Sequence, residues 1–294
     1  MKPPLPTRDG VGPSYVWVQA GEGPALLPFL AARFPDVSAE VWLDRIARGE
    51  LVDQAGRPLA TDSTVRRGDC LFYYRELAYE TPVPFTETVL FRDEHLLIAD
   101  KPHFLPVIPT GRHLQETLLV RLKRRLGLDE LTPIHRIDRD TAGLVVFSLN
   151  PASRGVYQAL FQQRAISKTY EAIAPALPGL DFPFVHRSRM VPGTPFFRMQ
   201  EAPGEPNSET WIDLIGERDG LCHYRLQPVT GRKHQLRVHL AGLGAPIVGD
   251  AFYPEVREVA DDDFSQPLKL LARAIAFTDP INGESREFVS ERRL

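Results

Sequence analysis

Apolar residues recur at helical spacing in two segments near the start of the chain, residues 25–34 and 38–49. In the second segment Val41, Leu43 and Ile46 can share one face of a helix, which predicts the face that packs against the core. Short apolar runs separated by turn residues follow this segment and predict small strands. The pattern therefore indicates a compact α/β module.

A polar segment with two prolines, ETPVPFTET over residues 80–88, interrupts these patterns. Such composition is typical of a connection between structural units. A chain of 294 residues is long enough for two domains. We therefore expect a small N-terminal module over residues 1–80 and a larger domain over residues 85–294.

The larger domain contains mostly strand-like patterns, with helical patterns between them. The segments GLVVFSL, KTYEAIA, ETWIDLIG and CHYRLQPV are typical of strands. In LQETLLVRLKRRLG a leucine recurs at every fourth position, and HQLRVHLAGLG has leucines at i, i+4 and i+7, so both predict helices. Strands with interspersed helices predict an α+β fold with a largely antiparallel, mixed sheet.

The composition also indicates the cellular compartment of the protein. With 43% hydrophobic and 25% charged residues, the chain resembles a soluble globular protein. No stretch approaches the roughly 20 apolar residues of a membrane span, and the N-terminus lacks an apolar signal region. Cys70 and Cys222 stand far apart without a CxxC partner, which favours a reducing compartment. We expect a cytoplasmic protein with no membrane partner.

The overall charge does not by itself indicate a nucleic-acid partner. The 35 basic and 38 acidic residues give a formal net charge of −3. A local basic groove remains compatible with this total, because phosphate contacts depend on where the charges lie. One basic cluster, Lys123 to Arg125, fills part of the other surface of the leucine-rich helix, where a solvated face and an RNA contact are equally good interpretations.

Charge is concentrated immediately before an apolar run that is typical of a buried strand. The residues from His135 to Asp140 include one histidine, two arginines and two aspartates. Because unpaired buried charge is costly, the segment is either an exposed turn with local salt bridges or a site. Asp138 and Asp140 could serve as an acid and a base, as in glycoside hydrolysis, although two residues of spacing do not set their separation. Their arginine neighbours favour the ionised form, which suits a nucleophile or base better than a proton donor.

Two further clusters combine basic residues with other chemistry. Lys168 and Tyr170 are two positions apart in a predicted strand and therefore share a face. A strand tyrosine usually belongs to the core, but an aromatic plane in a basic cleft suits a flipped nucleobase. The segment TGRKHQLR places Arg232 and Lys233 at the expected start of a helix, where free N–H groups attract phosphate.

Arg237 lies on the same predicted helix, beside its leucine stripe. An arginine next to a buried stripe needs a carboxylate partner, and we expect this partner to be Asp138. The histidines provide neither an HExxH pair nor a ligand-like cluster, although His234 and His239 are five positions apart. We therefore expect no metal site.

Five segments, in order over residues 85–290, resemble those of the RluA-type pseudouridine synthases. HRIDRDTAGL is similar to the family's HRLDRxTSGL, and KTYEA to its second motif. TGRKHQLRVHLAGLGAPIVGDAFY is similar to its third, and LLIADKPHFLPVIPTG and LLARAIAFTDPINGE resemble flanking segments. More loosely, residues 25–80 resemble the small RNA-binding module that precedes many such enzymes, although seven arginines there face nine acids.

The resemblance implies a pseudouridine synthase fold and the isomerisation of specific uridines in structured rRNA or tRNA, with no cofactor and no metal. By motif, Asp138 matches the catalytic aspartate and nucleophile, and Tyr170 matches the tyrosine that packs on the uracil. Arg237 matches the arginine that pairs with the catalytic aspartate. Arg136 matches the residue that helps displace the target base. The side chains expected to bind RNA are His135, Arg136, Arg139, Lys168, Arg232 and Lys233.

Two other functions are compatible with parts of the sequence. A non-catalytic RNA-binding protein could use the same scaffold, but the intact set of Asp138, Tyr170 and Arg237 argues against it. A carboxylate-dependent glycosidase or nucleosidase would rest on Asp138 and Asp140 alone.

Overall fold

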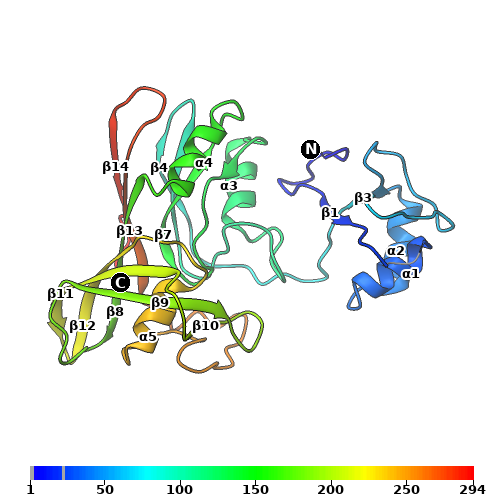
Figure 1. Ribbon diagram of the computed structural model, residues 1–294. Coiled ribbons are helices and arrows are strands. Elements are labelled where there is room, and N and C mark those ends of the chain that lie inside the picture. The colour runs from blue at the N-terminus through cyan, green and yellow to red at the C-terminus, as the bar shows by residue number, and fades with distance from the viewer. Residues whose placement is uncertain (1–2, 22–23) are drawn as a thin grey trace. The chain divides into compact units, whose positions relative to one another are not determined.

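The structure is a computed structural model that describes residues 3–21 and 24–294. It divides the chain into two compact units, Met1–Glu80 and Thr81–Leu294 (Figure 1). Within the described residues, no helix has both the length and the apolar character required to span a bilayer.

The smaller unit packs two helices against a three-stranded antiparallel sheet in the order β1-β3-β2. Its elements are β1 (Ser14–Trp17), α1 (Leu26–Arg33), α2 (Ala39–Ala47), β2 (Leu51–Val52) and β3 (Cys70–Tyr73). The predicted buried face of α2 is wrong in part, because Val41 and Leu43 are exposed and only Ile46 packs against the core. Trp42 takes the buried position instead, where its large ring covers the most apolar surface.

The larger unit is built on one mixed sheet of eleven strands in the described residues. The order is β10-β9-β11-β12-β8-β13-β7-β5-β4, with β14 beside β13 and β6 beside β7. The strands are β4 (Thr88–Arg92), β5 (Leu96–Lys101), β6 (Thr132–Pro133), β7 (Ala142–Ser148), β8 (Ile166–Pro175), β9 (Phe184–Pro192), β10 (Met199–Ala202), β11 (Ser208–Arg218), β12 (Leu221–Pro228), β13 (Leu270–Thr278) and β14 (Ser285–Val289). Among these strands only β7 and β13 pair in parallel, so the predicted α+β fold with a largely antiparallel sheet is confirmed.

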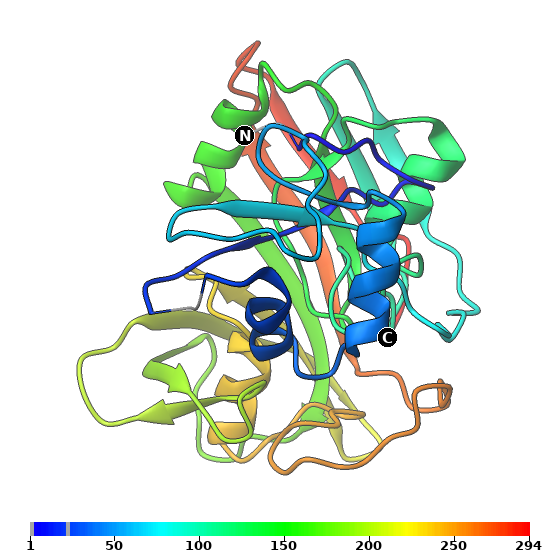
Figure 2. The same ribbon diagram turned by 90° about the vertical axis from the view of Figure 1, so that its right-hand side faces the viewer.

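Three helices cover this sheet: α3 (Leu118–Leu126), α4 (Arg154–Gln162) and α5 (Gln235–Gly242) (Figures 1 and 2). Alternate residues of the fully buried strand β7 face opposite sides. Val145 and Phe147 pack in one core with leucines of α3, whereas Val146 packs in another with Tyr157 of α4. The helix α5 packs against β8 and β12 through a third core.

The parallel contact between β7 and β13 fixes the start of β7. Gly143 has a φ of +107°, and a Cβ there would lie 2.3 Å from the carbonyl oxygen of Ala272. Only glycine fits such a close approach of two backbones. This contact sets where the charged segment before β7 ends.

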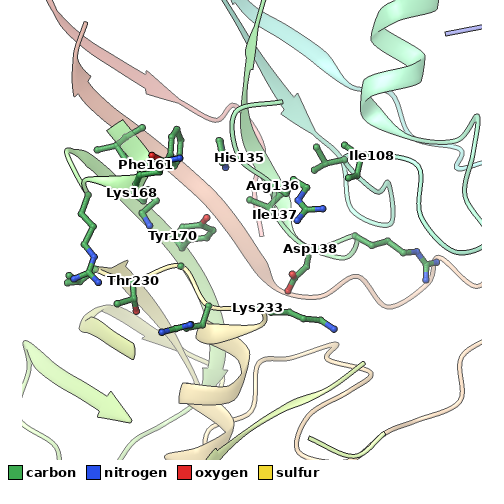
Figure 3. A pocket seen from close by; sticks show the side chains of 18 of the residues that line it. Ile108, His135, Arg136, Ile137, Asp138, Phe161, Lys168, Tyr170, Thr230 and Lys233 are labelled. Atoms are coloured by element: carbon green, nitrogen blue, oxygen red, sulfur yellow. The ribbon is translucent and has the colours of Figure 1, made fainter. Parts of the chain in front are cut away.

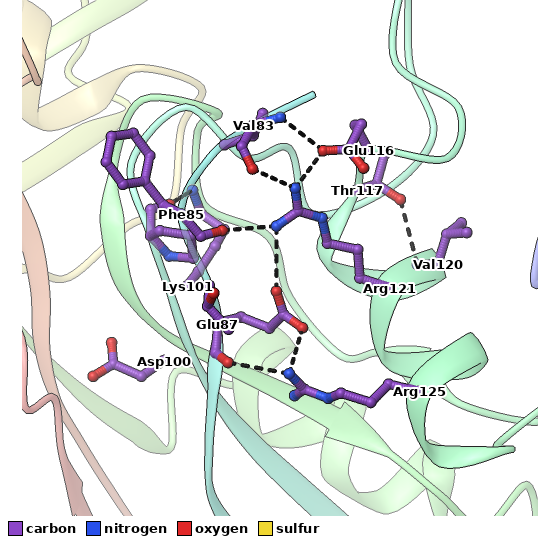
Figure 4. Close-up of polar contacts among 12 residues, drawn as sticks. Val83, Phe85, Glu87, Asp100, Lys101, Glu116, Thr117, Val120, Arg121 and Arg125 are labelled. Atoms are coloured by element: carbon purple, nitrogen blue, oxygen red, sulfur yellow. Dashed lines mark hydrogen bonds and ion pairs between the residues drawn. The ribbon is translucent and has the colours of Figure 1, made fainter. Parts of the chain in front are cut away.

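The helix α3 ties the connecting segment to the larger unit (Figure 4). Arg121 donates to the carbonyl oxygens of Val83 at 2.6 Å and Phe85 at 2.8 Å. Arg125 forms an ion pair with the buried carboxylate of Glu87 at 2.9 Å. One member of the basic cluster, Arg125, is therefore engaged in an intramolecular ion pair, a structural role that neither interpretation of the cluster included.

A truncated protein that begins at Thr81 is expected to fold on its own, because it retains both the sheet and the Arg121 contacts to Val83 and Phe85. Circular dichroism and thermal melting would show a cooperative transition. Chemistry on a short RNA should persist, while affinity for a full-length substrate falls. An unfolded truncated protein would show that the larger unit depends on residues 1–80.

Candidate active site

The charged segment is a loop, residues 134–141, that runs from β6 to β7. Two groups from the end of β5 hold its backbone. The buried ammonium of Lys101 donates to the carbonyl oxygen of Arg139 at 2.8 Å, and Nδ1 of His103 lies 2.7 Å from that of Asp140. Burial lowers the pKa of Lys101 to about 7, against the raising influence of the nearby Asp140 and Asp138 carboxylates. These contacts hold the backbone of Arg139 and Asp140, directly after Asp138, and so restrict the position of Asp138.

The loop forms one wall of a cleft of about 810 Å³ in the larger unit (Figure 3). The described residues that line it include six cationic side chains and a single carboxylate, that of Asp138. The cationic residues are Arg136, Arg139, Arg164, Lys168, Arg232 and Lys233. A smaller pocket of about 110 Å³ adjoins the cleft, and Asp138, Tyr170 and Arg237 line it together.

The strand β8 forms the opposite wall and presents Lys168 and Tyr170 on one face (Figure 3). Burial raises the pKa of the Tyr170 phenol, and the negative charge of Asp138 raises it further. The phenol therefore stays neutral and offers an aromatic plane with a hydroxyl. Burial also lowers the pKa of Lys168, and the positive charge of Arg164 adds to this effect.

His135 connects the loop to β7. Its Nε2 accepts a hydrogen bond from the Val146 amide at 3.1 Å, and its ring stacks on Phe161 with centroids 4.6 Å apart. Burial lowers the pKa of His135 to about 3, with a further contribution from the charge of Lys168. The imidazole is therefore neutral at physiological pH and lines the cleft as a polar, uncharged ring.

The helix predicted over HQLRVHLAGLG is present, but Arg232 and Lys233 precede it and do not lie at its start. The helix α5 begins at Gln235, and His234 before it has a left-handed backbone with φ of 56°. The Oε1 atom of Gln235 accepts from the Thr230 hydroxyl at 2.6 Å and the Arg232 amide at 3.1 Å. Because the Arg232 amide donates to the Gln235 side chain, it is not free to bind a phosphate. The side chains of Arg232 and Lys233 remain exposed in the cleft.

Arg237 joins α5 to the loop. Its Nη1 lies 3.4 Å from Oδ2 of Asp138, so the predicted contact is present. The predicted burial holds only for the arginine, whose side chain is 1% exposed, whereas that of Asp138 is 27% exposed. The tighter partner is Asp250, which Arg237 contacts at 2.8 Å through Nε and at 2.7 Å through Nη2. Burial alone would lower the pKa of Arg237, but the hydrogen bonds and charge of Asp250 outweigh it and raise the pKa.

Comparison with protein families matches residues 95–242 to the RNA pseudouridylate synthase family. The chain is 30% identical over 217 residues to the dual-specificity RNA pseudouridine synthase RluA of Haemophilus influenzae, covering 72% of this chain and 96% of that protein. It is 31% identical over 219 residues to RluA of Escherichia coli, covering 71% and 95%. The chain belongs to the RluA-type RNA pseudouridine synthases. Accordingly, it is an enzyme that isomerises uridine to pseudouridine in RNA.

Solved structures agree with this fold. The human RNA pseudouridylate synthase domain containing 1 superimposes with a TM-score of 0.58 at 24% identity, covering 73% of this chain and 86% of that one. The three-dimensional likeness shows that the larger unit has the pseudouridine synthase fold.

The pseudouridine synthase brings its sequence-predicted site residues together. Eight of the nine line the main cleft: His135, Arg136, Asp138, Arg139, Lys168, Tyr170, Arg232 and Lys233. Arg237, the ninth, lines the adjoining pocket. Sequence reasoning missed Phe161 and Arg164, which come from a helix that it did not predict and from the turn after it. It also missed Asp250, although this residue lies within the third motif as the acid of GDAFY.

The synthase also holds a histidine cluster that sequence reasoning missed. Among the described residues, His186, Glu201 and His239 place potential metal-ligand atoms within 4.8 Å of one another. His186 already pairs with Glu201 at 2.8 Å, and the two imidazole nitrogens of His239 each lie 2.9 Å from a hydroxyl, of Thr210 and Ser208. Hydrogen bonds therefore account for these buried nitrogens. None of the three residues lines the cleft.

Proposed function

We propose that Asp138 is the nucleophile of this synthase and that it acts on a uridine flipped out of structured rRNA or tRNA. The observation that carries the proposal is the placement of Asp138 as the one carboxylate among the described residues that line a cationic cleft. It lies next to Tyr170 and within 3.4 Å of Arg237. The cationic side chains of the lining surround it with positive charge, which suits an anionic nucleophile.

The reaction is an isomerisation and needs no oxidant or reductant. The bond between N1 of uracil and C1′ of ribose breaks, the freed base turns, and a bond between C5 and C1′ forms. The proton of C5 leaves to solvent and N1 gains one, so atoms and charge balance. The ionised carboxylate of Asp138 serves by attack on the sugar carbon or on the uracil ring, and abstraction of a sugar proton requires the same ionised form.

The smaller pocket supports retention of the base between the two bond events. It adjoins Asp138 and is bounded by the neutral ring of Tyr170, on which a uracil can stack. Unstacking a base from RNA costs a few kcal/mol. The cationic side chains of the cleft can offset this cost by contacting phosphates. The two RluA relatives are named dual-specificity RNA pseudouridine synthases, which supports RNA as the substrate.

The proposal is tested by mapping pseudouridines in total RNA from cells with and without this protein. We expect the loss of pseudouridine at specific rRNA or tRNA positions, and its return when the purified protein acts on the corresponding unmodified transcript. A protein that binds the transcript but forms no pseudouridine would support the non-catalytic alternative. Loss of pseudouridine outside rRNA and tRNA would overturn the proposed substrate class.

A further inference from the structure

Asp250 holds two of the three nitrogens of the Arg237 guanidinium and leaves one for Asp138. The Nε and Nη2 atoms lie 2.8 and 2.7 Å from the two oxygens of Asp250. Both side chains are only 1% exposed. The Nη1 atom lies 3.4 Å from Asp138, longer than the roughly 2.7–2.9 Å of a strong charge-assisted hydrogen bond.

The chain around Asp250 fixes the position of this carboxylate. Its Oδ1 also accepts from the amides of Phe252 at 2.8 Å and Tyr253 at 3.1 Å. Gly249 before it has a φ of +80°, and a Cβ there would lie 2.4 Å from the carbonyl oxygen of Pro267. Only glycine fits at this place, so the turn that presents Asp250 is sterically determined.

Two aromatic rings from the same turn cover the guanidinium. Its central carbon lies 4.9 Å from the ring centroid of Phe252 and 5.4 Å from that of Tyr253. The rings exclude water and restrict rotation of the planar group. Arg237 therefore has one orientation, in which Nη1 is directed toward Asp138.

We propose that Asp250 is a positioning residue for the isomerisation and acts through Arg237. It aligns the guanidinium and balances its charge, so that Asp138 is oriented by a single long contact and its oxygens are not tied up in a tight ion pair. This inference rests on the proposed role of Asp138 as nucleophile. It explains why the arginine beside the nucleophile is bound twice by another carboxylate.

Asp250→Asn is the primary test, measured as tritium release from a [5-³H]uridine-labelled transcript that the wild-type protein modifies. The amide NH₂ would oppose a guanidinium N–H, so Arg237 loses one bond and turns toward Asp138. We expect kcat to fall by at least about 100-fold, with KM within about threefold of wild type. A kcat within about threefold of wild type in a folded variant would overturn the inference.

A double-mutant comparison separates positioning from a merely structural role. If Asp250 acts through Arg237, adding Asp250→Asn to Arg237→Gln should change kcat by less than about threefold. The second change should also raise the melting temperature, because it removes a buried carboxylate that has lost its partner. A further loss of kcat as large as that in the wild-type background would show that Asp250 acts independently of Arg237.

Asp279→Asn is the matched control, since Asp279 is also buried and accepts from the Tyr157 hydroxyl and the Ile281 amide. Asp279 directly follows the last residue of β13, whereas Leu270, at the first residue of this strand, lines the smaller pocket. At ~3.3 Å per residue the strand separates Asp279 from Leu270 by on the order of 25 Å. Asp279→Asn should lower stability and leave kcat unchanged. If Asp250→Asn does not fold, Asp250→Glu decides: its longer side chain should displace the guanidinium and lower kcat at least tenfold, roughly, and wild-type kcat would overturn the inference. Absence of activity in the wild-type protein would instead refute the proposed function.

Discussion

Asp138→Asn is expected to abolish pseudouridine formation while leaving the fold and RNA binding intact. The amide has nearly the same shape as the carboxylate but cannot act as a nucleophile or base. Loss of a nucleophile costs at least about 10⁴-fold in turnover in well-studied enzymes. Stability should change by less than ~1 kcal/mol, since Asp138 is partly exposed and Arg237 keeps Asp250 as its main partner.

Single-turnover tritium release measures pseudouridine formation by the variant, and a filter-binding assay on the same transcript measures its RNA binding. The matched control is Asp140→Asn, two residues along the same loop, whose carboxylate does not line the cleft. The control should retain kcat within about threefold. Turnover by purified Asp138→Asn well above background would refute the assignment of the nucleophile.

Arg237→Gln is expected to lower both stability and activity. The sequence predicts Asp138 as the partner of Arg237, but the carboxylate that is left buried without this arginine is Asp250, which is 1% exposed, whereas Asp138 is 27% exposed. A buried charge that loses its partner costs roughly 3–5 kcal/mol. In a unit of this size such a loss lowers the melting temperature by on the order of 10 °C. The rate should fall as well, because Asp138 loses its orientation.

Urea denaturation followed by circular dichroism gives the free energy of unfolding for each variant. Arg237→Lys should recover part of the stability, because an ammonium keeps the charge but cannot reproduce the planar fork that bonds Asp250 twice. A free energy of unfolding for Arg237→Gln within ~1 kcal/mol of wild type would contradict the buried pair. So would full recovery by Arg237→Lys.

The sequence predicts those features of the fold that depend on local patterns of residues. The charged loop before β7 and the leucine repeat of α3 are local patterns, and the structure contains both. The strand β9 has an irregular burial pattern without clean alternation, so periodicity could not reveal it. The face of α2 was misjudged because a single large ring, Trp42, outweighs two smaller apolar side chains.

The sequence predicted the contact of Arg237 with Asp138 but did not reveal its tighter partner, Asp250. Spacing in sequence cannot rank two carboxylates when both reach the arginine only through the tertiary fold. Asp250 lies 13 residues away in an irregular turn, and Asp138 lies 99 residues away in another loop. Likewise, the loop before α5 is held by a hydrogen bond from the Arg232 amide to the Gln235 side chain, which no helical pattern encodes.

The cationic cleft has a kinetic consequence in a chain whose formal net charge is −3. Since the cleft itself carries an excess of positive charge, the remaining surface is more acidic than the total suggests. The positive field of the cleft attracts an RNA strand and steers encounters toward this part of the larger unit. Encounters through other faces are repelled, which limits unproductive association with the bulk of cellular RNA. The encounter rate should therefore fall steeply as salt shortens the range of the field, to about 10 Å at 0.1 M.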